Sequence, residues 1–194
     1  MGWNQVRWTE AHQVASLMGV DEDALPAPGT APEQHFRELR DDGDRAGAVM
    51  FLGHALPRLE ALAWAARIVE EEAAGRELRN ADRQALDHAL RWLGDPSDTS
   101  RRAAMDAADA AGDRSPERLL ALGVFFSGGS ISQPELPPVP PEPHIAGRMA
   151  AGAVAMAAIR AMAPGPEGRD AVFDRALDLG HRIADHGMKA LDPA

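Results

Sequence analysis

The sequence contains no cysteine and no tyrosine, and it has a single lysine, Lys189. Without cysteine there is no disulfide, no thiolate nucleophile and no cysteine-based zinc or iron–sulfur site. The single lysine is not part of a G-x-x-x-x-G-K-[ST] motif, which excludes that phosphate-binding loop. With only this lysine near the C-terminus, the sequence also argues against Schiff-base chemistry. The motifs G-x-S-x-G, H-E-x-x-H and G-x-G-x-x-G are also absent. Most familiar catalytic templates are therefore excluded.

Residues that favour β-strands are scarce. Aromatic residues make up 5% of the chain, and alanine, leucine, arginine and glutamate are abundant. These four residue types have high helix propensity, so the composition predicts an all-α protein. An apolar fraction of 45% argues against intrinsic disorder, and 194 residues are enough for one hydrophobic core. We expect a single domain.

Basic residues are fewer than acidic ones. Thirty acidic and 20 basic side chains give a net charge of −10 at pH 7. Nucleic-acid phosphates and anionic lipid headgroups repel such a chain, whereas a basic protein surface attracts it. The charge therefore predicts another protein with a basic surface as the partner, and neither nucleic acid nor a membrane. The charge does not decide whether the protein also forms a homo-oligomer.

Long hydrophobic runs are missing as well. The most apolar stretch, residues 145–163, is mostly alanine and contains Arg148 and Arg160, whereas a membrane-spanning helix needs about 20 apolar residues. The first residues, MGWNQVRWTEAHQV, lack the basic and apolar regions of a secretion signal. We expect a cytoplasmic protein.

Capping residues and apolar spacing predict about eight helices, arranged as a bundle or as an irregular stack of helical hairpins. Residues 59–69, LEALAWAARIV, are apolar on nearly every side, which predicts a helix surrounded by others. The expected single domain, 1–194, comprises an N-terminal arm with short helices (1–44), central helices (45–128), a proline-rich strap (129–143) and a C-terminal helical pair (144–190).

Proline is concentrated in one segment. Residues 125–144, FFSGGSISQPELPPVPPEPH, hold six of the 15 prolines, too many for a helix or a central strand. In polyproline II conformation the 15 residues of the strap span roughly 45 Å. We predict an ordered crossover that lies flush against the helices and delivers the next helix parallel to the previous one. Glu135 and Glu142 disfavour the alternative of an SH3 ligand, which prefers basic flanks.

The strongest candidate for chemistry lies in the last helix. Asp174, Asp178, His181 and Asp185 fall at positions i, i+4, i+7 and i+11 and so share one helical face. Carboxylates and an imidazole in this pattern could ligate a divalent metal, or act as a base and its orienting group. The opposite face is apolar, so the simpler interpretation is the solvated side of an amphipathic helix. We favour that interpretation and predict no catalytic residue, metal or cofactor.

Two groups of residues are candidates for contact with a partner. Trp3 and Trp8 precede the first clear helix and either dock on the body or anchor a partner. Glu70, Glu71 and Glu72 follow the apolar helix, where the negative end of the helix dipole disfavours acids. We interpret these glutamates as an acidic surface kept for binding, or as part of a longer helix.

Three stretches together resemble an uncharacterised family of small all-helical bacterial proteins: LPRLEALAWAARIV (56–69), DPSDTSRRAAMDAADAAG (95–112) and SGGSISQPELPPVPPEPH (127–144). The resemblance covers roughly residues 45–165, and the Gly-Gly and proline-strap motif is its most specific part. The resemblance implies an association with type VI secretion genes. It assigns no functional residue to this chain, because none is assigned in the family. The stretch WLGDPSDTSRRAA (92–104) is also loosely similar to helical immunity proteins that neutralise bacterial toxins.

The sequence therefore favours a non-enzymatic accessory or adaptor protein that binds another protein, with a type VI secretion system as its expected setting. Two alternatives stay open. The first is an immunity protein that neutralises a bacterial toxin. The second is a metal-binding protein or enzyme that uses the Asp/His stripe.

Overall fold

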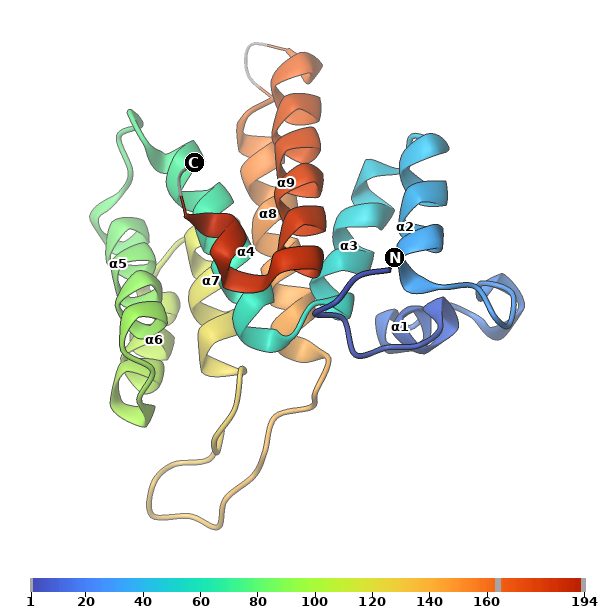
Figure 1. Cartoon of the computed structure of the whole chain (residues 1–194). Helices are drawn as coiled ribbons and strands as arrows, with labels where there is room; N and C mark the ends of the chain where they lie inside the picture. The colour runs from blue at the N-terminus through green and yellow to red at the C-terminus, as the bar shows by residue number, and fades with distance from the viewer. Residues whose placement is uncertain (1, 163–164, 193–194) are drawn as a thin grey trace.

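The computed structural model describes residues 2–162 and 165–192, and within these ranges the secondary structure is helical, without strands (Figure 1). The all-α single domain predicted from the composition is confirmed. The elements are α1 (Ala11–Met18), η1 (Glu22–Ala24), α2 (Pro32–Asp41), α3 (Arg45–Ala55), α4 (Arg58–Ala73), α5 (Asn80–Gly94), α6 (Asp98–Ala110), α7 (Pro116–Phe125), α8 (Ile145–Arg160), α9 (Pro166–His186) and η2 (Gly187–Leu191).

Helix α4 is the centre of the fold, as its apolar sequence predicts. It contacts α3, α5, α7, α8 and α9, and Trp64 in its middle has no exposed surface. The indole Nε1 of Trp64 donates a hydrogen bond of 2.8 Å to the carbonyl oxygen of Ala176 in α9. The one polar atom of this core side chain is therefore satisfied.

The remaining helices form two groups on either side of α4, α8 and α9 (Figure 1). Helices α5, α6 and α7 pack on one another on one side, and α1, α2 and α3 do so on the other. Within the described ranges, no helix has both the length and the apolar character that crossing a membrane would require.

Two glycines bring α3 and α8 into backbone contact. A Cβ atom added at Gly147 of α8 would lie 2.3 Å from the carbonyl oxygen of Gly53 in α3, far inside van der Waals contact. Only residues without a side chain allow this crossing. It places the corner between α3 and α4 beside the start of α8.

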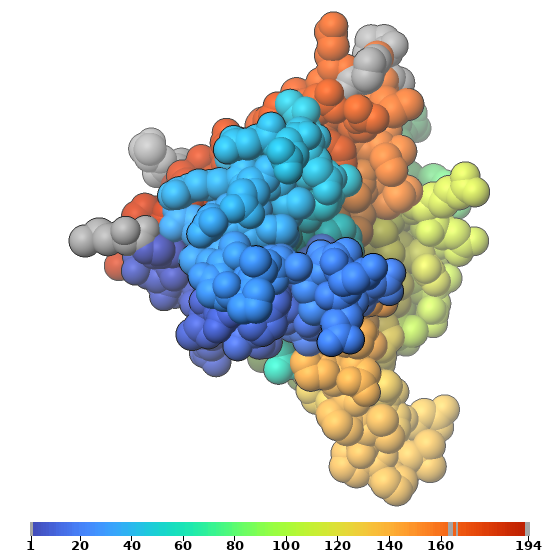
Figure 2. Space-filling view, turned by 90° about the vertical axis from the view of Figure 1, so that its right-hand side faces the viewer, coloured from blue at the N-terminus to red at the C-terminus, as the bar shows by residue number. Residues whose placement is uncertain are grey.

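The strap does not lie against the helices, so that prediction was wrong. Helices α7 and α8 pack side by side, and α7 ends where α8 begins, at the same end of the molecule (Figure 1). The two helices are therefore antiparallel, and the strap projects from that end as a loop (Figure 2). Residues 133–140 are all exposed. The length of a polyproline segment sets how far it reaches, but not its direction.

Candidate functional site

The Asp/His stripe of α9 faces the N-terminal helices and pairs with their arginines. Asp174 accepts hydrogen bonds of 2.8 and 3.2 Å from Arg45 of α3, and Asp178 accepts one of 2.9 Å from Arg40 of α2. The hydrogen bond from Arg45 is the main reason that the pKa of Asp174 lies below its usual value. These acids thus connect α9 to α2 and α3, while their side chains stay solvated, with Asp174 48% and Asp178 59% exposed.

His181 and Asp185 complete the stripe beside the N-terminal arm. Nδ1 of His181 accepts a hydrogen bond of 3.0 Å from the indole of Trp3, and Nε2 of His181 lies 3.6 Å from a carboxylate oxygen of Asp185. In the part of the chain that the structure describes, no three His, Asp or Glu side chains are grouped so as to hold a metal ion.

The two N-terminal tryptophans have different environments. Trp3 is 8% exposed and packs against Phe36 of α2, with ring centroids 5.1 Å apart. Of the two alternatives predicted for Trp3, its position agrees with docking on the body of its own chain. Trp8 is 36% exposed, and its Nε1 donates a hydrogen bond of 3.3 Å to the carbonyl oxygen of His54. Trp8 stays a candidate for contact with a partner.

The three glutamates lie in the last turns of α4, which continues to Ala73. Glu71 pairs with Arg67 at 2.8 Å, and Glu72 pairs with Arg175 of α9. These ion pairs offset the unfavourable position at the helix end. Two of the three acids are thus partnered inside the molecule, and Glu70 is exposed to solvent.

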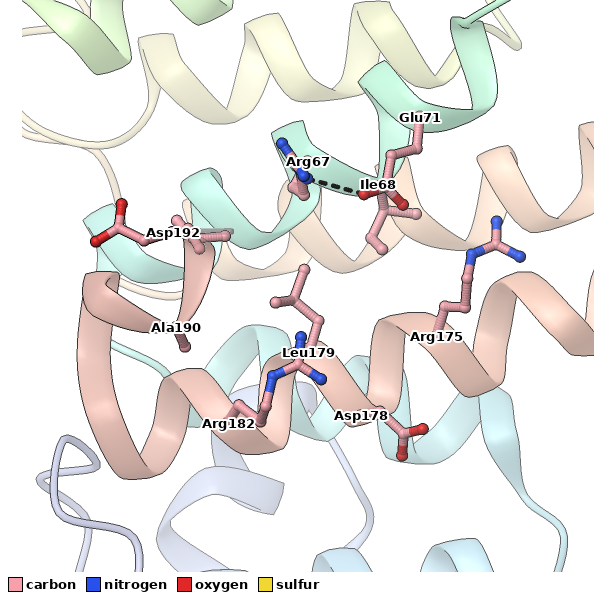
Figure 3. A pocket seen from close by; sticks show the side chains of 10 residues that line it. Arg67, Ile68, Glu71, Arg175, Asp178, Leu179, Arg182, Ala190 and Asp192 are labelled. Atoms are coloured by element: carbon pink, nitrogen blue, oxygen red, sulfur yellow. Dashed lines mark hydrogen bonds and ion pairs between the residues drawn. The ribbon is translucent and has the colours of Figure 1, made fainter. Parts of the chain in front are cut away.

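A cavity of about 450 Å³ lies beside these ion pairs, between α4, α9 and η2 (Figure 3). Its lining mixes both signs of charge, with Arg67, Arg175 and Arg182 on one hand and Glu71, Asp178 and Asp192 on the other. Because these charges balance, the lining carries no net charge that would favour a ligand of one sign.

Two adjacent arginines of α6 hold the base of the strap. The side chain of Arg101 is 4% exposed and donates hydrogen bonds to the carbonyl oxygens of Phe125 at 2.6 Å and Ser130 at 2.8 Å. Arg102 donates to the carbonyl oxygens of Ser132 at 3.0 Å and Ser130 at 3.1 Å. Charge-assisted bonds of this kind are stronger than neutral ones. We call Arg101 and Arg102 the arginine clamp.

Asp98 and Gly129 support the arginine clamp. Asp98 accepts hydrogen bonds from both guanidinium groups, which keeps the pKa of this carboxyl below its usual value. Gly129 has a φ of +66°, and a Cβ atom there would lie 3.0 Å from Arg101. Neither clamp arginine was predicted from the sequence. The one available signal was a pair of cations near the start of a helix, where the dipole disfavours them.

Beyond its base the strap folds on itself. The N–H of Ile131 donates a hydrogen bond of 2.8 Å to the carbonyl oxygen of Val139, and the Ser132 hydroxyl donates one of 2.8 Å to the carbonyl oxygen of Pro137. Leu136 is 56% exposed and Val139 is 49% exposed. The strap is therefore an ordered loop with a fixed base that presents apolar side chains to solvent, as binding loops do.

A groove of about 670 Å³ lies where the strap meets the body. The N-terminal arm, α1, the corner between α3 and α4, and the start of α8 form its walls. Its apolar lining includes Trp8, Leu17, Leu59 and Pro143, and its charged or titratable lining consists of Arg7, Arg58, Glu60, His54 and His144. We call it the Trp8 groove.

His54 lies in the wall of the Trp8 groove and is 6% exposed. Its Nδ1 lies 2.8 Å from the carbonyl oxygen of Met50, which assigns the proton to Nδ1 and leaves Nε2 as an acceptor. Nε2 has no hydrogen-bond partner among the described residues. Burial is the main reason that the pKa of His54 is lowered, and Arg148 and His144 add to the effect.

The helical core, the arginine clamp and the projecting strap define a small all-α protein with a preformed surface loop. The chain belongs to a family of unknown function, DUF6931, which it matches over residues 35–184. Membership of an uncharacterised family is thus confirmed. The match is longer than the 45–165 covered by the resemblance and includes most of α9, whereas Trp3 and Trp8 lie outside it. No curated protein and no solved structure matches the chain significantly.

Proposed function

We propose that this chain is a non-enzymatic accessory or adaptor protein that binds another protein with the end of the molecule that carries the strap. The observation that supports this proposal is the combination of a base fixed by the arginine clamp and an exposed apolar tip at Leu136 and Val139. Burying such side chains contributes about 25 cal/mol per Å². A base that is already ordered reduces the entropy lost on binding.

The charge of the strap supports a partner with a basic surface. Glu135 and Glu142 flank the exposed Leu136 and Val139, and the strap has no basic residue. Opposite charges accelerate the encounter of two proteins and favour one orientation, while the apolar contacts slow dissociation.

The specific setting we propose is a type VI secretion system, in the cytoplasm. This part of the proposal depends on the resemblance carried by SGGSISQPELPPVPPEPH (127–144). The alternative of an immunity protein is supported by the net charge of −10, because an acidic protein attracts a basic toxin.

Photo-crosslinking in the native host tests the proposed function. We expect a photoreactive amino acid at Leu136 to trap a partner that mass spectrometry identifies. The same amino acid at Glu77, which is also exposed, is the matched control and should not trap that partner. A trapped secretion component supports the accessory role, and a trapped toxin supports the immunity alternative. If Leu136 traps no protein beyond those trapped at Glu77, the proposal is wrong.

A further inference from the structure

We propose that the Trp8 groove binds the strap of a second copy of this chain, so that two molecules exchange their straps reciprocally. This inference rests on the proposed function, because it assigns a first partner to the same end of the molecule. The proposed homodimer would present a paired surface to any further partner.

The charges of the groove and the strap are complementary. Arg7 and Arg58 line the groove and are exposed, and neither forms an ion pair with another described residue. Among the described residues that line the groove, Glu60 is the only acid. The groove is thus a basic site in a chain whose net charge is −10. A basic partner would be repelled there, whereas the strap brings Glu135 and Glu142 and no basic residue.

The apolar chemistry also matches. Trp8 is 36% exposed and Leu59 is 39% exposed in the groove, so an aromatic ring and an aliphatic side chain are available for contact. Proline-rich segments bind grooves of this kind because they lose little conformational entropy on docking. The tip of the strap carries four prolines between positions 137 and 141, together with Leu136 and Val139.

The shape of the molecule favours exchange between copies over closure within one copy. Pro143 and His144, at the end of the strap, line the groove, while the rest of the strap extends away from the body (Figure 2). A chain therefore cannot fill its own groove with the tip of its strap unless the loop refolds. A projecting loop next to a groove is self-complementary about a two-fold axis, since each copy offers what the other accepts.

Charge reversal on each side of the proposed contact tests the exchange. We expect wild-type protein to form a dimer in sedimentation velocity, with a sedimentation coefficient that rises with concentration. The groove variant Arg7→Glu/Arg58→Glu and the strap variant Glu135→Arg/Glu142→Arg should each raise the dissociation constant of the dimer about tenfold or more. Mixing the two variants should restore the dimer, because each strap then meets a groove of opposite charge.

Two matched controls separate this contact from general charge effects. Arg83→Glu and Glu77→Arg change the net charge in the same directions at exposed positions outside the groove and the strap, and they should leave the dissociation constant unchanged. Circular dichroism and the melting temperature of each variant establish that it is folded.

A synthetic peptide with the sequence of residues 131–143, ISQPELPPVPPEP, is the second probe. It should bind the wild-type protein and quench or shift the fluorescence of Trp8. The groove variant should bind it at least tenfold more weakly, and a Trp8→Phe variant should lose the fluorescence response.

A wild-type protein that stays monomeric and does not bind the peptide overturns the inference. A dimer whose dissociation constant is unchanged in both charge-reversal variants also overturns the inference. The proposed function is tested separately: a monomer that is still crosslinked to a partner from Leu136 refutes the exchange alone. A strap-exchanged dimer that is crosslinked only to itself refutes the accessory role alone.

Discussion

The indole Nε1 of Trp3 donates a hydrogen bond of 3.0 Å to Nδ1 of His181, and the two residues lie 178 positions apart in the chain. The Trp3 ring also packs against Phe36, whose ring stacks on the His181 ring at a centroid distance of 5.8 Å. The N-terminal arm is thus held on α2 and α9 by one aromatic cluster, in which Trp3 and Phe36 are buried and His181 is partly exposed. Through this hydrogen bond, His181 of the candidate stripe helps to hold the N-terminal arm in place.

Trp3→Ala should release the N-terminal arm. We expect the free energy of unfolding, measured in urea, to fall by about 3–5 kcal/mol, because a buried aromatic side chain and its hydrogen bond are lost. Trypsin should cut after Arg7 faster than in the wild type. Trp8→Ala, at a more exposed position, is the control and should cost less than about 1 kcal/mol. Equal losses in the two variants would contradict the docking of Trp3.

His54 should make the stability depend on pH near neutrality. Burial lowers its pKa below 6.5, so between the two pKa values the unfolded chain binds more protons than the folded one. The free energy of unfolding should therefore be highest above pH 6.5 and fall as the pH decreases below it. Asp82, Asp98 and Asp174, whose pKa values are lowered from 3.8, contribute only at more acidic pH.

Urea titrations between about pH 7.5 and 5.5 measure the effect of His54. His54→Asn keeps a donor near the Met50 carbonyl oxygen but does not ionise, so its stability should change less with pH than that of the wild type. His186→Asn, at an exposed position, is the matched control. A pH dependence that is the same in His54→Asn and in the wild type would show that another group is responsible.

Gly147→Ala should destabilise the crossing of α3 and α8. The new methyl group would lie 2.3 Å from the Gly53 carbonyl oxygen, so the helices must separate, at a cost of about 1–3 kcal/mol. Gly152→Ala in the same helix is the control, because its methyl group would lie 3.4 Å from Leu119, in ordinary contact. Thermal unfolding should show a lower Tm for Gly147→Ala and an equal or higher Tm for Gly152→Ala.

Arg101→Lys should loosen the base of the strap. The guanidinium group of Arg101 donates to the carbonyl oxygens of Phe125 and Ser130 at the same time, and a lysine ammonium lacks this planar fork. We therefore expect the free energy of unfolding to fall by about 2 kcal/mol. A glutamate-specific protease should then cut after Glu135 faster than in the wild type. Arg83→Lys, at an exposed position, should change neither quantity. An unchanged cleavage rate in Arg101→Lys would show that the clamp does not order the loop.

The parts of the fold that follow from local pattern were predictable. The segment LEALAWAARIV has no polar face, so its helix had to be surrounded, and Trp64 is fully buried. The stripe on α9 was also correctly placed on one helical face. Its partners were not predictable, because Arg45 and Arg40 lie 129 and 138 positions before the aspartates they bind.

By itself, the sequence determined that this protein is all-α, acidic and built around one apolar helix, because composition and short-range periodicity govern helix formation and burial. Only the tertiary structure decided that the strap projects from the body, that Arg101 and Arg102 hold it, and that the α9 stripe joins helices. These outcomes depend on contacts between residues far apart in the chain, which local spacing does not encode. Tertiary contacts of this kind also bring the strap, which carries Glu135, and the groove, which Arg58 lines, to the same end of the molecule.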